Sequence, residues 1–84
     1  NENIDVNIQS EYGYTALIWA SRNKNTNTVK LLLNNENIDV NIQSEYSYTA
    51  LIWASKNRNT NIVKLLLSND LIDIYLNFFK SVLN

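Results

Sequence analysis

The sequence predicts an all-α repeat fold, in which helix-turn-helix units stack into a solenoid and extended hairpin loops join them. The chain is an internal duplication, since residues 1–34 and 35–68 differ at only five of 34 positions. Each copy holds two short apolar segments at helical spacing, separated by polar residues. A period in the thirties with two helices per unit is typical of stacked repeats. The differences between the copies are Gly13/Ser47, Arg22/Lys56, Lys24/Arg58, Thr28/Ile62 and Asn34/Ser68.

Each copy opens with an extended stretch and a turn. In the first copy, apolar and polar residues alternate over residues 4–8, and a polar cluster follows at residues 9–13. Gly13 adopts a positive φ at low cost, whereas Ser47, its counterpart in the second copy, adopts that conformation at a higher cost. We therefore expect the two turns to differ in conformation.

Two helices follow the turn in each copy. Thr15 stands where an N-cap residue is favoured, so we expect the first helix at about residues 16–23. After a polar break, apolar residues recur at helical spacing over residues 28–33. Asn25 or Thr26 is expected to cap this second helix.

Residues 69–84 form a separate C-terminal segment, for which two interpretations compete. Residues 72–74 repeat the start of each copy, which favours a partial third repeat. Alternatively, Asp70 caps a helix whose apolar stripes on residues 71–83 cover the second copy. We favour the C-terminal capping helix, because the apolar end of a stack needs a cover. The predicted divisions of the single folded unit are residues 1–34, 35–68 and 69–84.

The repeated unit resembles the ankyrin repeat. The segment Thr-Ala-Leu-Ile-Trp-Ala at residues 15–20 is similar to the family's Thr-Pro-Leu-His-x-Ala, and the resemblance continues through residues 28–33 and 39–41 to cover residues 1–74. Tetratricopeptide repeats share the 34-residue period, but their Trp, Leu-Gly and Tyr spacing is not found. The departures are Ala16 and Ala50 in place of Pro, Ile18 and Ile52 in place of His, and Lys24 and Arg58 in place of Gly at the end of the first helix.

Composition argues against several functional classes. The chain has no Cys or His, and 7 basic residues nearly balance 8 acidic ones. Nucleic acid is not an expected partner without a basic patch, and no apolar run approaches the roughly 20 residues of a membrane span. The acidic residues recur one repeat apart, too far for a shared proton, and no Ser has a base beside it. We expect a soluble, cytoplasmic protein that is not an enzyme and holds no metal or cofactor.

The resemblance implies a protein or peptide partner, which the hairpin tips and the concave side of the first helix of each unit would contact. Tyrosines gather at the turns, where they offer a large contact area at low entropic cost. The candidate partner-binding residues are Gln9, Glu11, Tyr12, Tyr14, Trp19, Arg22, Asn23, Gln43, Glu45, Tyr46, Tyr48, Trp53, Lys56 and Asn57.

Two kinds of residue in this list, each present once in every copy, have a structural interpretation as well as a functional one. Trp19 and Trp53 either pack only between adjacent helices or also contact a partner as aromatic anchors, and we favour packing. Arg22 and Lys56 end the first helix of each unit, where a cation complements the helix dipole. That explanation is at least as good as partner contact.

The near identity of the copies suggests an alternative function, a structural unit that stacks on itself. The face that the first copy shows to the second is the face that the second would show to a third. In the first copy, apolar residues of the segments 4–8, 17 and 31–33 face an open end of the stack. The absence of an initial Met suggests a fragment. The alternative is therefore a homo-oligomer joined through the N-terminal end of the stack, or part of a longer array.

Overall fold

The computed structural model describes residues 4–73, and in that part of the chain every regular element is helical. Each repeat contributes one pair of α-helices, and a short 3-10 helix lies at the turn of the second hairpin. This confirms the prediction of an all-α repeat fold. The elements are α1 (Ala16–Arg22), α2 (Thr26–Leu33), η1 (Glu45–Ser47), α3 (Ala50–Lys56) and α4 (Thr60–Leu67).

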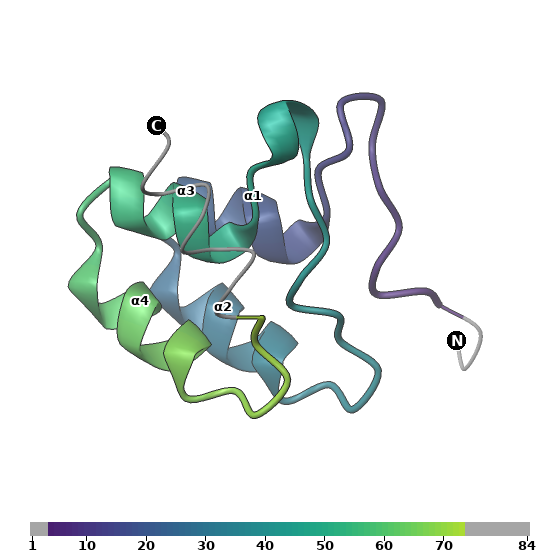
Figure 1. The fold of residues 1–84 in the computed structure, drawn as a ribbon. Helices are drawn as coiled ribbons and strands as arrows, with labels where there is room; N and C mark the ends of the chain where they lie inside the picture. Colours follow the sequence, from purple (N-terminus) through teal and green to yellow (C-terminus); the bar gives the residue numbers. More distant parts are fainter. Residues whose placement is uncertain (1–3, 74–84) are drawn as a thin grey trace.

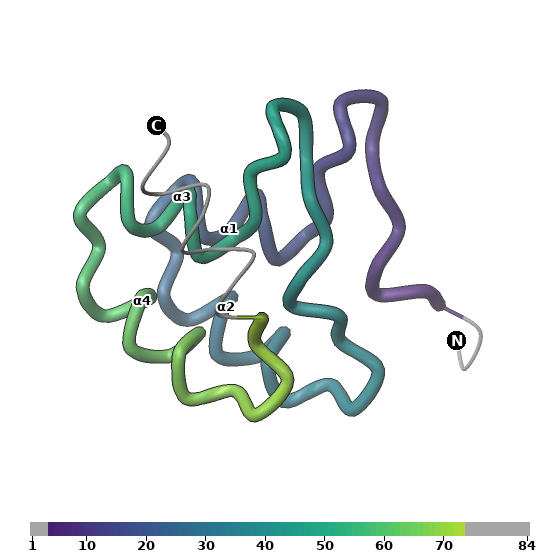
Figure 2. The backbone as a smooth tube through the Cα atoms, viewed as in Figure 1, coloured from purple at the N-terminus to yellow at the C-terminus, as the bar shows by residue number. Residues whose placement is uncertain are grey.

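The helices form two layers, and the hairpins extend from one side of them. Figure 1 shows α1 beside α3 in one layer and α2 beside α4 in the other, and each helix packs against its neighbour in both directions. The two hairpins run side by side, and their turns extend beyond the layer of α1 and α3, on the side away from α2 and α4 (Figure 2). The hairpin turns and the α1/α3 layer therefore border a common surface.

The four α-helices begin in the same way. Thr15 Oγ1 accepts a hydrogen bond of 3.2 Å from the Ile18 N–H, and Asn25 Oδ1 accepts one of 3.2 Å from the Thr28 N–H. Thr49 and Asn59 form the equivalent bonds in the second repeat. Each cap satisfies a backbone donor that the first turn of the helix leaves unpaired. The sequence prediction of these N-caps is confirmed, with Asn25 rather than Thr26 at α2.

The turn between the helices requires a left-handed residue. Lys24 has a φ of 62° and Arg58 a φ of 57°. Both stand where the ankyrin pattern has Gly, and a side chain in this conformation costs about 1 kcal/mol. The turn therefore keeps its geometry although both repeats lack the glycine.

The hairpin turns differ between the repeats, as expected from the sequence. Gly13 has a φ of 82°, and a Cβ on this residue would lie only 3.2 Å from the Ser44 Cα of the next hairpin. In the second repeat, Tyr46 and Ser47 both have a φ of 63°. Glycine in the first turn thus allows the second hairpin to approach closely.

Asparagine side chains connect each hairpin to the following one. Asn7 Nδ2 donates to the Asn37 carbonyl at 2.8 Å, and Asn7 Oδ1 accepts from the Asp39 N–H at 2.9 Å. Asn41 forms both bonds again with the backbone of residues 71–73, each at 2.7 Å. An amide suits this position because it offers a donor and an acceptor together.

The hydrogen bonds of Asn41 show how the C-terminal segment begins. Residues 71–73 sit on Asn41 in the same register that the start of the second repeat has on Asn7. Asp70 lies in a turn and begins no helix within the described residues. Our expectation that Asp70 caps a helix is wrong, because the backbone after it continues the hairpin register. The rest of the predicted capping helix, residues 74–84, lies outside the described part of the chain.

The core lies between the two repeats. Leu17 and Val29 from the first repeat and Ala54, Ile62 and Leu66 from the second are all fully or almost fully buried. They come from all four α-helices, so each repeat buries its apolar face largely against the other. Burial of this surface is the main stabilising contribution.

One buried polar atom in this interface has no hydrogen-bond partner among residues 4–73. It is the Oγ of Ser21, a residue of α1 that is completely buried. Its counterpart Ser55 is exposed in α3. We expect Ser21→Ala to raise the free energy of unfolding by about 1 kcal/mol more than Ser55→Ala does, because only the first variant removes an unsatisfied buried group.

Chemical denaturation of the two variants and the parent chain measures this difference. Both substitutions gain the same helix propensity, so Ser55→Ala controls for that effect. Equal changes in the two variants would contradict the prediction.

Candidate partner-binding surface

Four aromatic side chains form a continuous cluster across α1, α3 and the hairpins. The Tyr14 ring stands edge-to-face against Trp19, with 4.7 Å between the ring centroids, and against Trp53, with 6.2 Å. Tyr48 repeats the first contact in the second repeat, with 5.2 Å between its centroid and that of Trp53. Edge-to-face pairs add specific attraction to the burial of the rings. The cluster therefore fixes the orientation of both tryptophans.

Cations from the ends of α1 and α3 lie on these rings. The Arg22 Cζ is 4.8 Å from the centroid of Trp53, 5.4 Å from that of Trp19 and 5.5 Å from that of Tyr14. In the second repeat, the Lys56 Nζ is 5.2 Å from the Tyr48 centroid. A cation over an aromatic face is attracted by about 0.5–2 kcal/mol, depending on its exposure. Arg22 is thus held against the rings of both repeats.

The two tryptophans differ in exposure. The Trp53 Nε1 donates to Ser44 Oγ at 3.3 Å, and the side chain is half-buried. Trp19 is 42% exposed, and no hydrogen-bond acceptor of residues 4–73 meets its indole N–H. Packing therefore accounts for most of Trp53, whereas Trp19 packs with one part of its ring system and leaves the other part accessible.

Tyr14 connects this cluster to the second hairpin. Its side chain is buried, and its hydroxyl donates to Glu45 Oε1 at 3.3 Å. Burial raises the pKa of the hydroxyl above its ordinary value of 10.0, the positive charge of Arg22 opposes this rise, and the negative charge of Glu45 adds to it. Tyr14 is therefore a part of the structure rather than a freely accessible contact residue.

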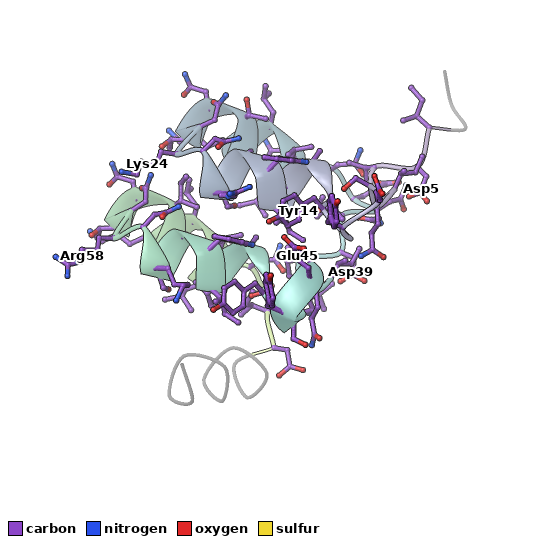
Figure 3. The ribbon with its side chains drawn as sticks, turned by 90° about the horizontal axis from the view of Figure 1, so that it is seen from above. Asp5, Tyr14, Lys24, Asp39, Glu45 and Arg58 are labelled. Carbon is purple, nitrogen blue, oxygen red and sulfur yellow. The ribbon has the colours of Figure 1, made fainter. Side chains whose placement is uncertain are left out.

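The hairpin turns carry the most exposed aromatic side chains. Tyr12 is 60% exposed and Tyr46 is 77% exposed, and the Glu45 N–H donates to the Tyr12 carbonyl at 2.9 Å, which holds the turns together. Viewed from above in Figure 3, Tyr14 and Glu45 lie close together, while Lys24 and Arg58 project at the opposite end of the helices from Asp5 and Asp39.

The structure divides the residues that the sequence predicted for the site. Tyr14 is buried, and two of the amides bond inside the protein: Gln9 Nε2 to the Gly13 and Gln43 carbonyls, and Asn57 Nδ2 to the Arg22 carbonyl. Asn23, the C-cap residue of α1, is exposed and lines a hollow together with Trp19. The exposed or half-buried remainder is Glu11, Tyr12, Trp19, Arg22, Gln43, Glu45, Tyr46, Tyr48, Trp53 and Lys56.

Sequence reasoning missed two features of the structure, one at this surface and one on the other helical layer. Ser44 is buried and accepts a hydrogen bond from the indole N–H of Trp53. The sequence carried a signal for this role, because a Ser in the hairpin and a Trp in the following helix recur together in both repeats. On the α2/α4 layer, a hollow of about 430 Å³ is lined by Thr26, Lys30, Asn61, Lys64, Leu65 and Ser68. The hollow arises only where two helices meet, so no local pattern predicts it.

Among residues 4–73, no group of three or more acidic, His or Cys side chains is placed to hold a metal ion. Nor is any helix in this range long and apolar enough to cross a membrane. The arrangement instead offers exposed aromatic faces, unpaired N–H donors and a few charges, which are the groups that fit contact with another macromolecule.

Comparison with known families identifies the repeat. A family model described as ankyrin repeats (3 copies) matches residues 2–77, which is most of the chain. The comparison with curated proteins gives no match.

The raised pKa of Tyr14 predicts how stability depends on alkaline pH. In the unfolded chain the hydroxyl loses its proton near its ordinary pKa of 10.0, whereas the native state holds the proton to a higher pH. The native state then binds more protons than the unfolded state, so this contribution to stability is complete below pH 10 and falls as pH rises through the folded pKa.

We expect Tyr14→Phe to reduce this loss of stability above pH 10, because phenylalanine has no proton to lose. Urea unfolding between pH 8 and about 11 measures it, and Tyr12→Phe at the exposed turn serves as the matched control. The prediction fails if both variants have the alkaline pH dependence of the parent chain.

Proposed function

Because this chain belongs to the ankyrin repeat family, whose repeats are generally protein–protein interaction modules, we propose that it is a non-enzymatic module that binds another protein or peptide. The proposed contact surface consists of the hairpin turns and the adjoining face of α1 and α3. The observation that supports it most directly is the exposed ring of Trp19, which contacts Tyr14 and Arg22 and whose indole N–H meets no acceptor among residues 4–73.

Rigid aromatic side chains are effective contact residues. They bury a large area and lose little conformational entropy when a partner binds, since neighbouring side chains already fix their orientation. Trp19 has this property through its edge-to-face contact, and the exposed Tyr12 and Tyr46 extend the same surface along the turns. The surface thus combines a fixed aromatic centre with a polar, tyrosine-containing border.

We expect substitutions in the surface to weaken binding without unfolding the protein. The partner is first isolated by pulldown with the parent chain from the source cell, and its affinity is then measured for Trp19→Ala and for the double variant Tyr12→Ala/Tyr46→Ala. Each is expected to weaken binding by about tenfold or more, the range of an interface hot spot.

The exposed Leu67→Ala, on α4, is the matched control and is expected to bind normally. The two tyrosines are preferred to Tyr14 and Tyr48, because these last two are buried or half-buried and their loss would disturb folding. A partner that binds all variants equally would overturn the proposed surface.

A second candidate function, self-stacking, is supported by the burial pattern of equivalent residues. Leu31 is 73% exposed and Ile8 is 65% exposed, whereas their counterparts Leu65 and Ile42 are half-buried against the first repeat. Ala16 is likewise exposed where Ala50 is buried. The first repeat therefore exposes a face that contains Ile8, Ala16 and Leu31. In the second repeat, the first repeat covers the equivalent face.

One of the five sequence differences lies on this face and weakens the case for self-stacking. Ile62 is completely buried against the first repeat, and its counterpart is the polar, half-buried Thr28. Self-stacking through this face would place a hydroxyl where the internal interface has an isoleucine side chain. We therefore rank this function second.

Sedimentation at high micromolar concentration tests the second candidate. If the face mediates stacking, the chain sediments above its monomer mass, and Leu31→Glu returns it to a monomer because it buries a charge in the interface. Tyr46→Glu, at the second hairpin turn, is the control and is expected to leave the assembly intact, because Tyr46 and its counterpart Tyr12 are both exposed and stacking of the repeats does not cover this position. A strictly monomeric and cooperatively folded parent chain would contradict self-stacking.

A further inference from the structure

Arg22 is a cation without an ionic partner. Within residues 4–73 its guanidinium forms neither an ion pair nor a hydrogen bond, and its only charge-related contacts are with the rings of Tyr14, Trp19 and Trp53. The side chain is half-buried, so it has lost part of its hydration. Such a group gains more from an added carboxylate than a fully hydrated cation does.

The rings hold the guanidinium in place without using its donors. Ring contacts act through the faces of the aromatic systems, whereas the N–H bonds of arginine lie in its own plane and point outward at its edge. A planar fork of N–H donors matches the two oxygens of a carboxylate. The three rings thus hold Arg22 in place, and within residues 4–73 its N–H groups meet no hydrogen-bond acceptor, so they are available to a ligand.

A second cation and a further donor accompany Arg22. Lys56 ends α3 as Arg22 ends α1 and lies on the adjoining Tyr48 ring, whereas Lys24 and Arg58 project at the end of the helices away from Tyr14. The Trp19 indole N–H adds a neutral donor beside an exposed apolar ring. Asp5 and Asp39 lie at the opposite end (Figure 3). An acidic group next to an apolar one would therefore find complementary partners here.

One acidic side chain of the protein lies beside this cluster. Glu45 accepts the Tyr14 hydroxyl at 3.3 Å, and its negative charge acts on the same ring that Arg22 contacts. It forms no ion pair with Arg22. An incoming carboxylate would be repelled by Glu45 while it is attracted by Arg22, so Glu45 limits the affinity for an acidic ligand.

We propose that the partner of the surface described above docks an acidic peptide segment, in which an Asp or Glu carboxylate bonds the Arg22 guanidinium and a neighbouring apolar side chain covers Trp19. This inference rests on the proposed function and specifies the chemistry of the partner. It also gives a role to the Arg22/Lys56 difference between the repeats, because lysine cannot form the planar two-bond contact.

Peptide selection tests the proposal on the full chain of 84 residues. The immobilised chain is used to select binders from a library of random dodecapeptides displayed on phage. The selected peptides are expected to share an acidic residue beside an aliphatic or aromatic one. Each is then synthesised with that residue intact or replaced by its neutral amide, and both forms are titrated against the parent and variant chains.

The expected result is a coupled loss of affinity. Neutralising the peptide carboxylate weakens binding to the parent by about tenfold but hardly changes binding to Arg22→Gln, as a charge-assisted bond to Arg22 requires. Arg22→Lys loses part of the affinity, Lys56→Gln loses less than about threefold, and Glu45→Gln binds more tightly than the parent. Thermal unfolding of each variant accompanies the titrations, since a merely structural role for Arg22 would change stability without changing the preference for the acidic peptide.

Two results would overturn the inference, and they bear differently on the proposed function. Selected peptides that contain no acid, bind Arg22→Gln normally and are lost with Trp19→Ala would refute the acidic partner while they support the binding surface. Failure to select any peptide, or selection of peptides that bind both Arg22→Gln and Trp19→Ala as well as the parent, would count against both.

Discussion

The interface between the two repeats is the constraint on which the rest of the structure depends. Neither repeat fully buries its own apolar face: Ile62 and Leu66 of the second repeat are completely buried, whereas their counterparts Thr28 and Leu32 in the first repeat are only half-buried. The same alanine is exposed at position 16 and buried at position 50. At such positions the place in the stack, rather than the residue type, decides burial, as expected for a quasi-one-dimensional protein.

The candidate binding surface is built on that interface and is not separate from it. Arg22 from the first repeat lies over Trp53 from the second, and Tyr14 contacts both tryptophans. Stacking of the repeats therefore sets the distance between the aromatic groups that a partner would meet. A substitution that loosens the stack is expected to change the surface as well, so binding and stability are coupled in this small chain.

Departures from the ankyrin pattern show how the chain retains its geometry with less favourable residues. Ile18 stands in place of the family's His, and it is almost completely buried, so packing replaces a polar contact at the junction of hairpin and helix. Lys24 accepts the left-handed conformation that Gly would adopt at lower cost. The N-caps at Thr15 and Asn25 and the Asn7 bridge between hairpins offset such losses with local hydrogen bonds.

The sequence alone determined the repeat period, the four α-helices with their N-caps and the family, because these depend on periodicity and on short-range hydrogen bonds that are encoded locally. It also placed Tyr12, Trp19 and Arg22 on one candidate surface. Only the tertiary structure decided that Tyr14 is buried, that Gln9 and Asn57 bond inside the protein, and that Trp19 is more accessible than Trp53. Each of these outcomes depends on what the neighbouring repeat covers, and two nearly identical segments of sequence cannot show which one has a neighbour on a given side.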